Sequence, residues 1–165
     1  MRIESSRFGA MELEDSDVIA FPDGIIGFPD ERAFVLLRRA DASPIGWLHS
    51  TRTPWLALPV VPTSALAADF PDEALAHEAR QSGLGAEGDD IAVMAVLSAI
   101  GGASATVNLV APIVINVETR VGAQVILEAS PFSTQEPFLL RTSGPPPTLR
   151  EHATYPREKR AAGAT

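Results

Sequence analysis

The chain has 165 residues, of which 45% are hydrophobic and 21% are charged, and its formal net charge is −8 at pH 7. This length fits one domain with a sizeable core, and so ordinary a composition excludes a chain that is disordered throughout. There is no cysteine, which excludes disulfide frameworks, thiolate metal sites and cysteine nucleophiles, and fits a reducing compartment.

The sequence shows neither a signal peptide nor a membrane span. The first six residues, MRIESS, lack the apolar stretch of a signal peptide. The longest apolar run, residues 91–100, is far shorter than the ~20 residues that a membrane helix needs. We therefore expect a cytoplasmic protein that does not enter a membrane.

The charge is unevenly distributed along the chain. Residues 1–140 carry 19 Asp and Glu against 8 Arg, a net charge of −11, whereas residues 141–165 carry 5 basic against 2 acidic side chains. An acidic body repels phosphate backbones and attracts basic protein surfaces, so we expect no direct nucleic-acid binding. Direct RNA binding would need clustered arginines, and Arg38-Arg39 is the only adjacent pair in the body. The simpler explanation of an acidic surface is solubility.

Period-2 alternation and Gly/Pro turns predict a mainly β protein made of short strands. The predicted strands are 2–8, 11–13, 18–21, 33–38, 45–50, 55–61, 90–99, 105–110, 112–117 and 123–127. Strands of this length with no regular helices between them predict a small antiparallel β-barrel-like domain with one short helix, over residues 1–140. Residues 141–165 form a Pro-rich C-terminal tail that we expect to be disordered.

The one predicted helix begins at Pro71-Asp72-Glu73 and ends at Gly83. Its apolar stripe is narrow. We therefore expect it to lie across one opening of the barrel and not to form a helical core.

Groups that could carry catalysis are sparse. The three histidines, His49, His77 and His152, have no metal-ligand spacing, and Lys159 is the only lysine. The glycine-rich stretch at 83–90 lacks the Lys-Ser/Thr ending of a phosphate loop and follows a helix. We expect no enzymatic activity, no metal and no cofactor.

Two asparagines stand in the most informative strand region, TVNLVAPIVINV at 106–117. Pro112 has no amide hydrogen to donate, so it should interrupt the sheet and let the strand serve two parts of it. Asn108 and Asn116 could bind polar groups of a ligand, although satisfying backbone groups at the bend is the favoured interpretation. The alternative function is a small-ligand split barrel or enzyme in which Asn108, Asn116 and His49 line a pocket.

The stretch FPDGIIGFPD at 21–30 resembles the Phe-Pro-x-Gly-Ile-x-Gly-Phe signature of the flagellar assembly factor FliW family. Four further pieces follow in the family's order: FVLL at 34–37, WLHS at 47–50, NLVAPIVIN at 108–116 and QVIL at 124–127. With the segments around these five pieces, the resemblance covers residues 2 to about 138. The chain departs from the family at FSTQEPF, residues 132–138, where Phe132 replaces a tyrosine and Gln135-Glu136 replace a basic pair.

The resemblance implies a small barrel-like protein that is not an enzyme. We expect it to be a monomer in the free state. Members of the family bind flagellin and, alternatively, the translational regulator CsrA, whose repression of flagellin mRNA translation they relieve. The function implied is thus partner exchange. The departure at 132–138 implies a partner surface with a different charge.

The turn at 21–30 is the candidate docking site, because Gly24 and Gly27 permit a shaped loop that presents two isoleucines inside an acidic rim. The candidate partner-binding residues are Asp23, Ile25, Ile26, Phe28, Asp30 and Glu31. The structural signature comprises Gly24, Gly27, Asn108, Pro112 and Asn116. Alternatively, both isoleucines fold inwards with Phe21 and Phe28 and plug one end of the barrel.

Overall fold

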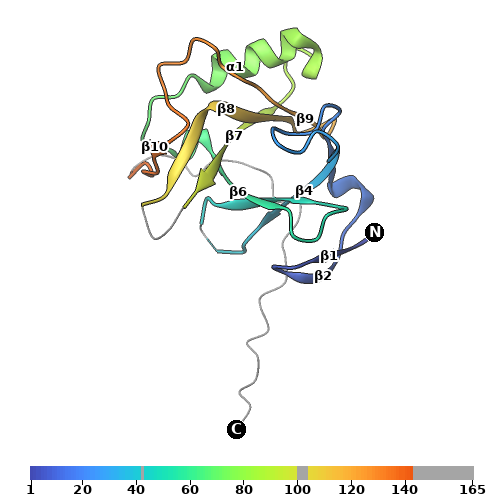
Figure 1. Cartoon of the computed structure of the whole chain (residues 1–165). Coiled ribbons are helices and arrows are strands. Elements are labelled where there is room, and N and C mark those ends of the chain that lie inside the picture. The colour runs from blue at the N-terminus through green and yellow to red at the C-terminus, as the bar shows by residue number, and fades with distance from the viewer. Residues whose placement is uncertain (42, 100–103, 143–165) are drawn as a thin grey trace.

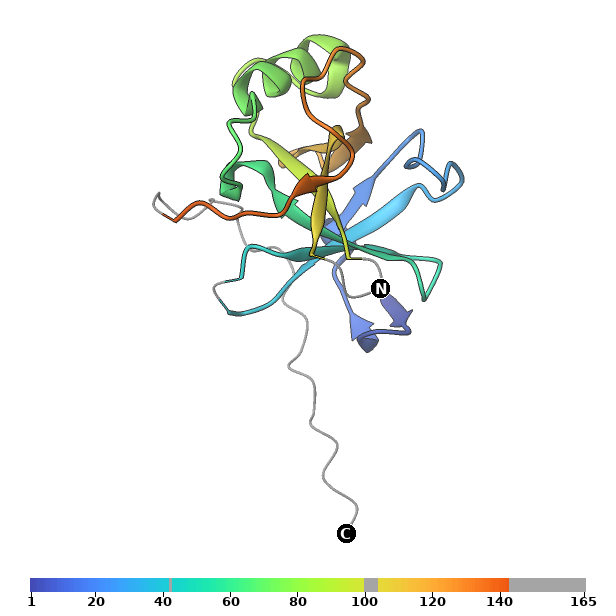
Figure 2. The ribbon, with the colours of Figure 1, turned by 60° about the vertical axis from the view of Figure 1, so that its left-hand side comes forward.

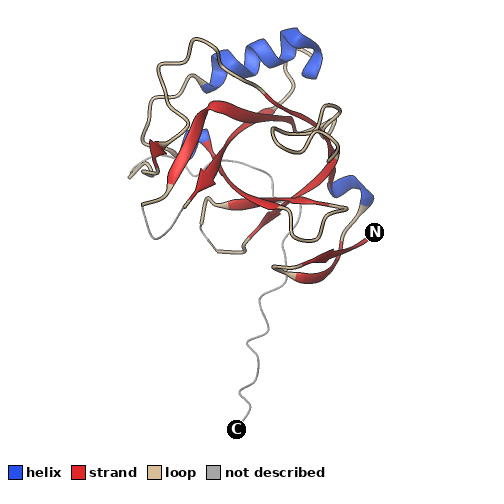
Figure 3. Cartoon of the chain, viewed as in Figure 1, coloured by secondary structure: helices blue, strands red, loops and turns tan. Residues whose placement is uncertain are grey.

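The computed structural model describes residues 1–41, 43–99 and 104–142 (Figure 1). In these ranges most elements are strands, and seven of the strands close into a barrel (Figure 3). The barrel strands are β3 (Val18–Ala20), β4 (Ala33–Arg38), β5 (Gly46–Ser50), β6 (Ala57–Pro62), β7 (Ile91–Ser98), β8 (Thr106–Asn116) and β9 (Val121–Gln124). The predicted mainly β, barrel-like fold with one short helix is confirmed.

The order of strands around the barrel follows the order in the chain. Each strand from β3 to β9 pairs antiparallel with the next. Because strand direction alternates, the first and the seventh strand run the same way, so the pair that closes the barrel has to be parallel. The closure is a single bridge between Ala20 and Val121, next to which the Ala20 N–H donates to the Arg120 carbonyl at 2.8 Å.

The barrel interior is filled by apolar side chains from its strands and from the loops that join them. Phe21 and Phe34 meet edge to face with their ring centroids 5.2 Å apart, and neither is exposed. The other buried members of this inner cluster are Ile19, Ile25, Leu48, Leu56, Val60, Met94, Ile113 and Ile115. The described interior is therefore a packed core and not a central ligand chamber.

Helix α1 (Asp72–Ala79) continues into one π-helical turn (Arg80–Leu84), within which Gly83 has a φ of +91°. The predicted end of the helix at Gly83 fits this geometry. Leu75, Ala76 and Ala79 are the buried helix residues, and they pack against the outward-facing side chains of β7 and β8.

The expectation that the helix lies across a barrel opening is wrong. Figure 1 shows the helix outside the ring of strands. The physical reason is the alternation in β7, where Val93 and Ala95 belong to the outer cluster while Met94 belongs to the inner one. Because both faces of this strand are apolar, its outer face has to be covered as well.

The first two strands form a separate hairpin, β1 (Arg2–Ser5) with β2 (Gly9–Glu12), so the predicted strand 2–8 is too long. Ile3 and Met11 of the hairpin pack on Val35 and Leu37, which are outward-facing residues of β4. A short 3₁₀ turn (Asp15–Asp17) then leads into the barrel. The hairpin therefore covers the β4 wall as the helix covers the β7 wall.

Strand β8 changes faces along its length. Val107 and Leu109 belong to the outer cluster, whereas Ile113 and Ile115 belong to the inner one. Odd-numbered residues thus lie on the outer side before Pro112 and on the inner side after it. The sequence predicted a bend at Pro112 that lets the strand serve two parts of the sheet, but the two predicted strands form one continuous element. On β7, Met94 pairs with Ile113 and Val96 pairs with Asn108, which marks an irregularity opposite the proline.

The C-terminal part of the described chain covers this irregular wall. Figure 2 shows it crossing β8, where β10 (Glu136–Pro137) pairs with Thr106 and Val107. Phe132 lies against Phe70 with ring centroids 5.5 Å apart. The divergent stretch 132–138 therefore supplies packing to the outer core.

Candidate functional site

The segment 21–30 connects β3 to β4 and folds back on itself in a tight turn. The Ile25 N–H donates to the Phe28 carbonyl at 3.2 Å, and the Phe28 N–H donates to the Ile25 carbonyl at 2.8 Å. Ile26 and Gly27 therefore occupy the two positions at the tip. The Ile26 N–H donates to Oε1 of Gln124 at 2.8 Å, which holds the turn against the end of β9.

Gly24 meets a steric requirement at the base of this turn. Its φ is +66°, and a Cβ atom there would lie 2.5 Å from the carbonyl oxygens of Phe28 and Pro29. A left-handed backbone and such close carbonyls leave room for glycine alone. The signature glycine thus fixes how the chain enters and leaves the tip.

The structure separates the two isoleucines. Ile25 is 4% exposed and joins the inner cluster with Phe21 and Phe34, whereas Ile26 is 55% exposed. Ile25 is bridged to Phe28 at the base of the turn, whereas Ile26 stands at its tip, so the two side chains have different environments. Of the two interpretations made from the sequence, inward packing fits Ile25 and surface presentation fits Ile26.

Three apolar side chains stand at the surface here, and we call Ile26, Phe28 and Trp55 the tip patch. Phe28 is half-buried and meets Trp55 edge to face, with ring centroids 5.9 Å apart. Trp55 is 65% exposed and lies in the loop between β5 and β6. Sequence reasoning missed Trp55 because it assigned residue 55 to a strand.

Acidic side chains accompany the tip patch in two different ways. Asp23 and Asp30 are exposed. Glu31 is half-buried and accepts hydrogen bonds from the hydroxyls of Thr53 and Ser50, the latter at 2.7 Å. These hydrogen bonds, that of Thr53 first, hold the pKa of Glu31 below its usual range. Glu31 therefore ties down the loop that carries Trp55, in addition to contributing charge.

Asn108 stabilises the irregular part of β8. Its Oδ1 accepts the backbone N–H groups of Val110 and Ala111, each at 3.0 Å. These two N–H groups stand where the strand switches faces before Pro112. The bond pattern is the one expected of an asparagine that satisfies backbone donors at a bend.

Asn116 makes the same motif at the other end of β8 and adds two donated bonds. Its Oδ1 accepts the N–H groups of Glu118 and Thr119 at 3.0 Å, and its Nδ2 donates to the Leu84 carbonyl at 3.1 Å and to the Asp89 carboxylate at 2.9 Å. The N–H of Ala86 and the Asn116 amide lower the pKa of the Asp89 carboxyl. Asn116 is fully buried, and each of its polar atoms has partners.

His49 also has a structural environment. It is fully buried, its Nδ1 lies 2.6 Å from the Ser50 carbonyl oxygen and its Nε2 lies 2.8 Å from Oγ of Ser5. Neither of the two surface hollows described for this structure is lined by His49, Asn108 or Asn116. Within the described residues, the polar atoms of these three side chains are instead bonded to the fold itself.

Residues 1–41, 43–99 and 104–142 contain no group of three or more His, Cys, Asp or Glu arranged to hold a metal ion. Across the same ranges, every helix is too short or too polar to span a bilayer.

Comparison with known proteins decides the family. The family model described as FliW protein matches residues 2–139. The chain belongs to the FliW family. A protein from Geobacter sulfurreducens called flagellar assembly factor FliW is 35% identical over 139 residues, which cover 84% of this chain and 86% of that protein. A protein of the same name from Heliobacterium modesticaldum is 36% identical over 137 residues, covering 82% and 88% of the two chains.

A solved structure supports the FliW assignment at the level of the fold. The crystal structure of the flagellar assembly factor FliW superposes with a TM-score of 0.66 and 32% sequence identity, and it covers 83% of this chain and 96% of that one. The FliW family is thus a family of flagellar assembly factors, and these names describe no enzymatic activity. The signature that suggested the family, residues 21–30, supplies Ile26 and Phe28 of the tip patch.

Proposed function

We propose that this chain is a non-enzymatic assembly factor of the cytoplasm that binds flagellin and, by partner exchange, the translational regulator CsrA. Binding of CsrA relieves its repression of flagellin mRNA translation, and binding of flagellin ends that relief. The membership in the FliW family supports the assembly role.

The observation that carries the proposal is the tip patch. Ile26 and Trp55 are large apolar side chains that are more than half exposed, and Phe28 lies in ring contact with Trp55. Aromatic and aliphatic anchors inside a polar rim are typical of protein interfaces, and Asp23 and Asp30 provide such a rim. The hydrogen bonds that fix the turn mean that the anchors are ordered before a partner arrives, which lowers the entropic cost of binding.

The charge of the body favours a basic partner. Residues 1–140 carry a net charge of −11. An RNA-binding regulator presents basic surface, so long-range attraction accelerates its encounter with this chain more than it strengthens the final complex. We therefore expect the association rate of CsrA to fall as the salt concentration rises.

The test is calorimetric titration of the full chain against flagellin and CsrA of the same organism. We expect at least one complex of sub-micromolar affinity, which corresponds to about −8 kcal/mol. Ile26→Ser and Trp55→Ala should each weaken binding about tenfold or more, as expected for buried interface anchors. Leu139→Ser is the matched control, because Leu139 is 63% exposed and lies outside the tip patch.

The two parts of the proposal fail in different ways. If the wild-type chain binds neither flagellin nor CsrA, the function is refuted. If it binds them but only the Leu139 variant weakens the complex, the function stands and the tip patch is not the docking site.

A further inference from the structure

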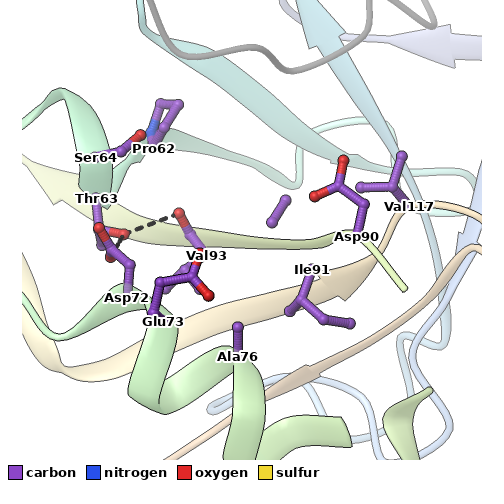
Figure 4. Close-up of a pocket in the computed structure, with 11 residues that line it drawn as sticks. Pro62, Thr63, Ser64, Asp72, Glu73, Ala76, Asp90, Ile91, Val93 and Val117 are labelled. Atoms are coloured by element: carbon purple, nitrogen blue, oxygen red, sulfur yellow. Dashed lines mark hydrogen bonds between the residues drawn. The ribbon is translucent and has the colours of Figure 1, made fainter. Parts of the chain in front are cut away.

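A hollow of about 330 Å³ lies between the start of α1 and the start of β7, apart from the tip patch (Figure 4). Carboxylates line it from two directions. Asp72 and Glu73 belong to the first turn of the helix, and Asp90 directly precedes β7. The floor between them is apolar and includes Ala76 and Ile91.

The three carboxylates form no ion pair within the described chain. None of them lies within ion-pair distance of a described Arg, His or N-terminal amine. Glu73 and Asp90 are exposed, and Asp72 is half-buried. Burial raises the pKa of Asp72, and the hydrogen bond from Thr63 opposes that rise. The hollow therefore concentrates negative charge that no ion pair of the described residues neutralises.

One edge of β7 is open inside this hollow. The pairing of β6 with β7 ends at Pro62 and Met94. Ile91 to Val93 continue beyond that point with β8 on one side only, and on the other side the Val93 carbonyl oxygen lies 3.1 Å from the Thr63 hydroxyl. An open strand edge beside side-chain hollows is the geometry that accepts an extended peptide.

The chain itself leaves the described body beside this hollow. The Arg141 N–H donates at 2.9 Å to the carbonyl of Ala65, the last residue of a 3₁₀ turn whose first two residues, Thr63 and Ser64, line the hollow. Arg141 is also among the charges that lower the pKa of Asp72. The described chain therefore ends close to the residues that line the hollow.

The residues beyond this point have the complementary charge. Residues 143–165 contain four basic side chains, Arg150, Arg157, Lys159 and Arg160, against Glu151 and Glu158. Fully extended chain spans ~3.3 Å per residue, so the nine residues from Arg141 to Arg150 reach up to about 30 Å. Every one of the four cations can therefore reach a hollow that begins next to Arg141.

We propose that the C-terminal segment 143–165 binds in this hollow of its own chain, with Arg or Lys side chains among the carboxylates of Asp72, Glu73 and Asp90 and its backbone along the open edge of β7. A short tether gives an effective concentration in the millimolar range, so even a dissociation constant of about 1 mM leaves the hollow about half occupied. Bound there, the segment competes with any basic partner for these carboxylates. The proposal does not depend on which partner the protein binds.

Paramagnetic relaxation in the full-length chain tests the proposal. Because the sequence has no cysteine, Tyr155→Cys gives a single attachment point for a nitroxide. We expect the amides of Ser64, Glu73 and Ala92 to relax faster than those of the β1–β2 hairpin, which serve as the reference. The difference should shrink as salt is added, since exposed charges are screened within about 10 Å at 0.1 M.

Matched charge variants separate specific docking from general attraction. Glu73→Gln with Asp90→Asn should remove the enhancement, whereas Glu12→Gln with Asp30→Asn, which deletes the same charge outside the hollow, should leave it intact. If the body variants disturb the amide spectrum, a triple tail variant makes the same test, and it too should remove the enhancement. Its substitutions are Arg157→Gln, Lys159→Gln and Arg160→Gln. Equal relaxation at hollow and hairpin, or equal loss in both body variants, overturns the proposal.

A mixed sample distinguishes the chain's own tail from that of a second copy. Nitroxide-labelled chains without ¹⁵N are combined with ¹⁵N-labelled chains that carry no nitroxide. We expect no enhancement in this sample. Enhancement at Ser64, Glu73 and Ala92 here would mean that the hollow takes the tail of another molecule, which would refute the intramolecular assignment.

Discussion

Replacing Asn116 by alanine tests whether the β8 asparagines support the fold or wait for a ligand. The side chain is fully buried and makes four hydrogen bonds. Three of them go to backbone groups, those of Leu84, Glu118 and Thr119. A net contribution of about 1 kcal/mol for each predicts a loss of about 3 kcal/mol. The fourth partner, the Asp89 carboxylate, is exposed enough for water to replace the amide.

Asn108→Ala is the matched control for this prediction. Asn108 makes the same two accepted bonds, to Val110 and Ala111, and none of the donated ones. We expect it to cost about 2 kcal/mol on the same reasoning. Both variants keep the β8 backbone and the Pro112 bend, so the difference between them isolates the bonds donated by Asn116.

Urea denaturation followed by tryptophan fluorescence measures both losses. The slope of the free energy of unfolding against urea should stay constant, because neither substitution changes how much surface unfolding exposes. The reasoning is refuted if Asn116→Ala leaves the free energy of unfolding unchanged, or lowers it less than Asn108→Ala does. Either result would reopen a ligand-binding role for these side chains.

Three further predictions concern the tip and the outer wall. Gly24→Ala should lower the free energy of unfolding by more than about 2 kcal/mol, because the left-handed backbone alone costs ~1–2 kcal/mol and the new Cβ would lie 2.5 Å from two carbonyl oxygens. Gly27→Ala should lower it less, because a Cβ there would have no atom within 4 Å. Glu31→Gln should make the free energy of unfolding fall less steeply than in the wild type as the pH is lowered from neutral into acid. The folded-state pKa of Glu31 is lowered, so its stabilisation is present above the unfolded pKa and is lost as pH falls through the folded pKa. Phe132→Ala should lower the free energy of unfolding by about 2 kcal/mol. This loss is smaller than that for a fully buried phenylalanine, since the Phe132 ring is half-buried against Phe70.

The same urea experiment checks all three, repeated from neutral into acid pH for Glu31→Gln. Equal losses for Gly24→Ala and Gly27→Ala would contradict the steric argument at Gly24. An acid limb that Glu31→Gln leaves as steep as in the wild type would show that its hydrogen bonds to Ser50 and Thr53 carry no net stabilisation. A Phe132→Ala variant as stable as the wild type would mean that the C-terminal segment does not hold the outer wall.

The strands were predictable wherever the alternation of side chains is strong. The predicted strand 33–38 has the bounds of β4, and 90–99 differs from β7 by one residue at each end. The bend at Pro112 was predictable because proline lacks an amide hydrogen. β10 was not predictable, since its two residues, Glu136 and Pro137, have low β propensity and form a strand only because β8 lies beside them.

The arrangement of the site depended on tertiary contacts that no local pattern carries. Two adjacent apolar residues such as Ile25 and Ile26 do not reveal which one points inwards, because that depends on where the barrel axis lies. Trp55 reaches the tip patch from a different loop, through contact with Phe28. The helix showed an apolar stripe in the sequence, but only the doubly apolar β7 determines which surface the stripe covers.

The parallel bridge between Ala20 and Val121 determines the order in which the barrel can form and open. All other neighbouring strands within the barrel are consecutive in the chain, so their hairpins can assemble locally, whereas this bridge joins segments about 100 residues apart. We expect it to form last in folding, and amide hydrogens of β3 and β9 to exchange before those of β7 and β8. Gln124, the residue that holds the N–H of Ile26, lies at the end of β9. Transient opening of the barrel at this bridge therefore loosens the very turn that presents the tip patch.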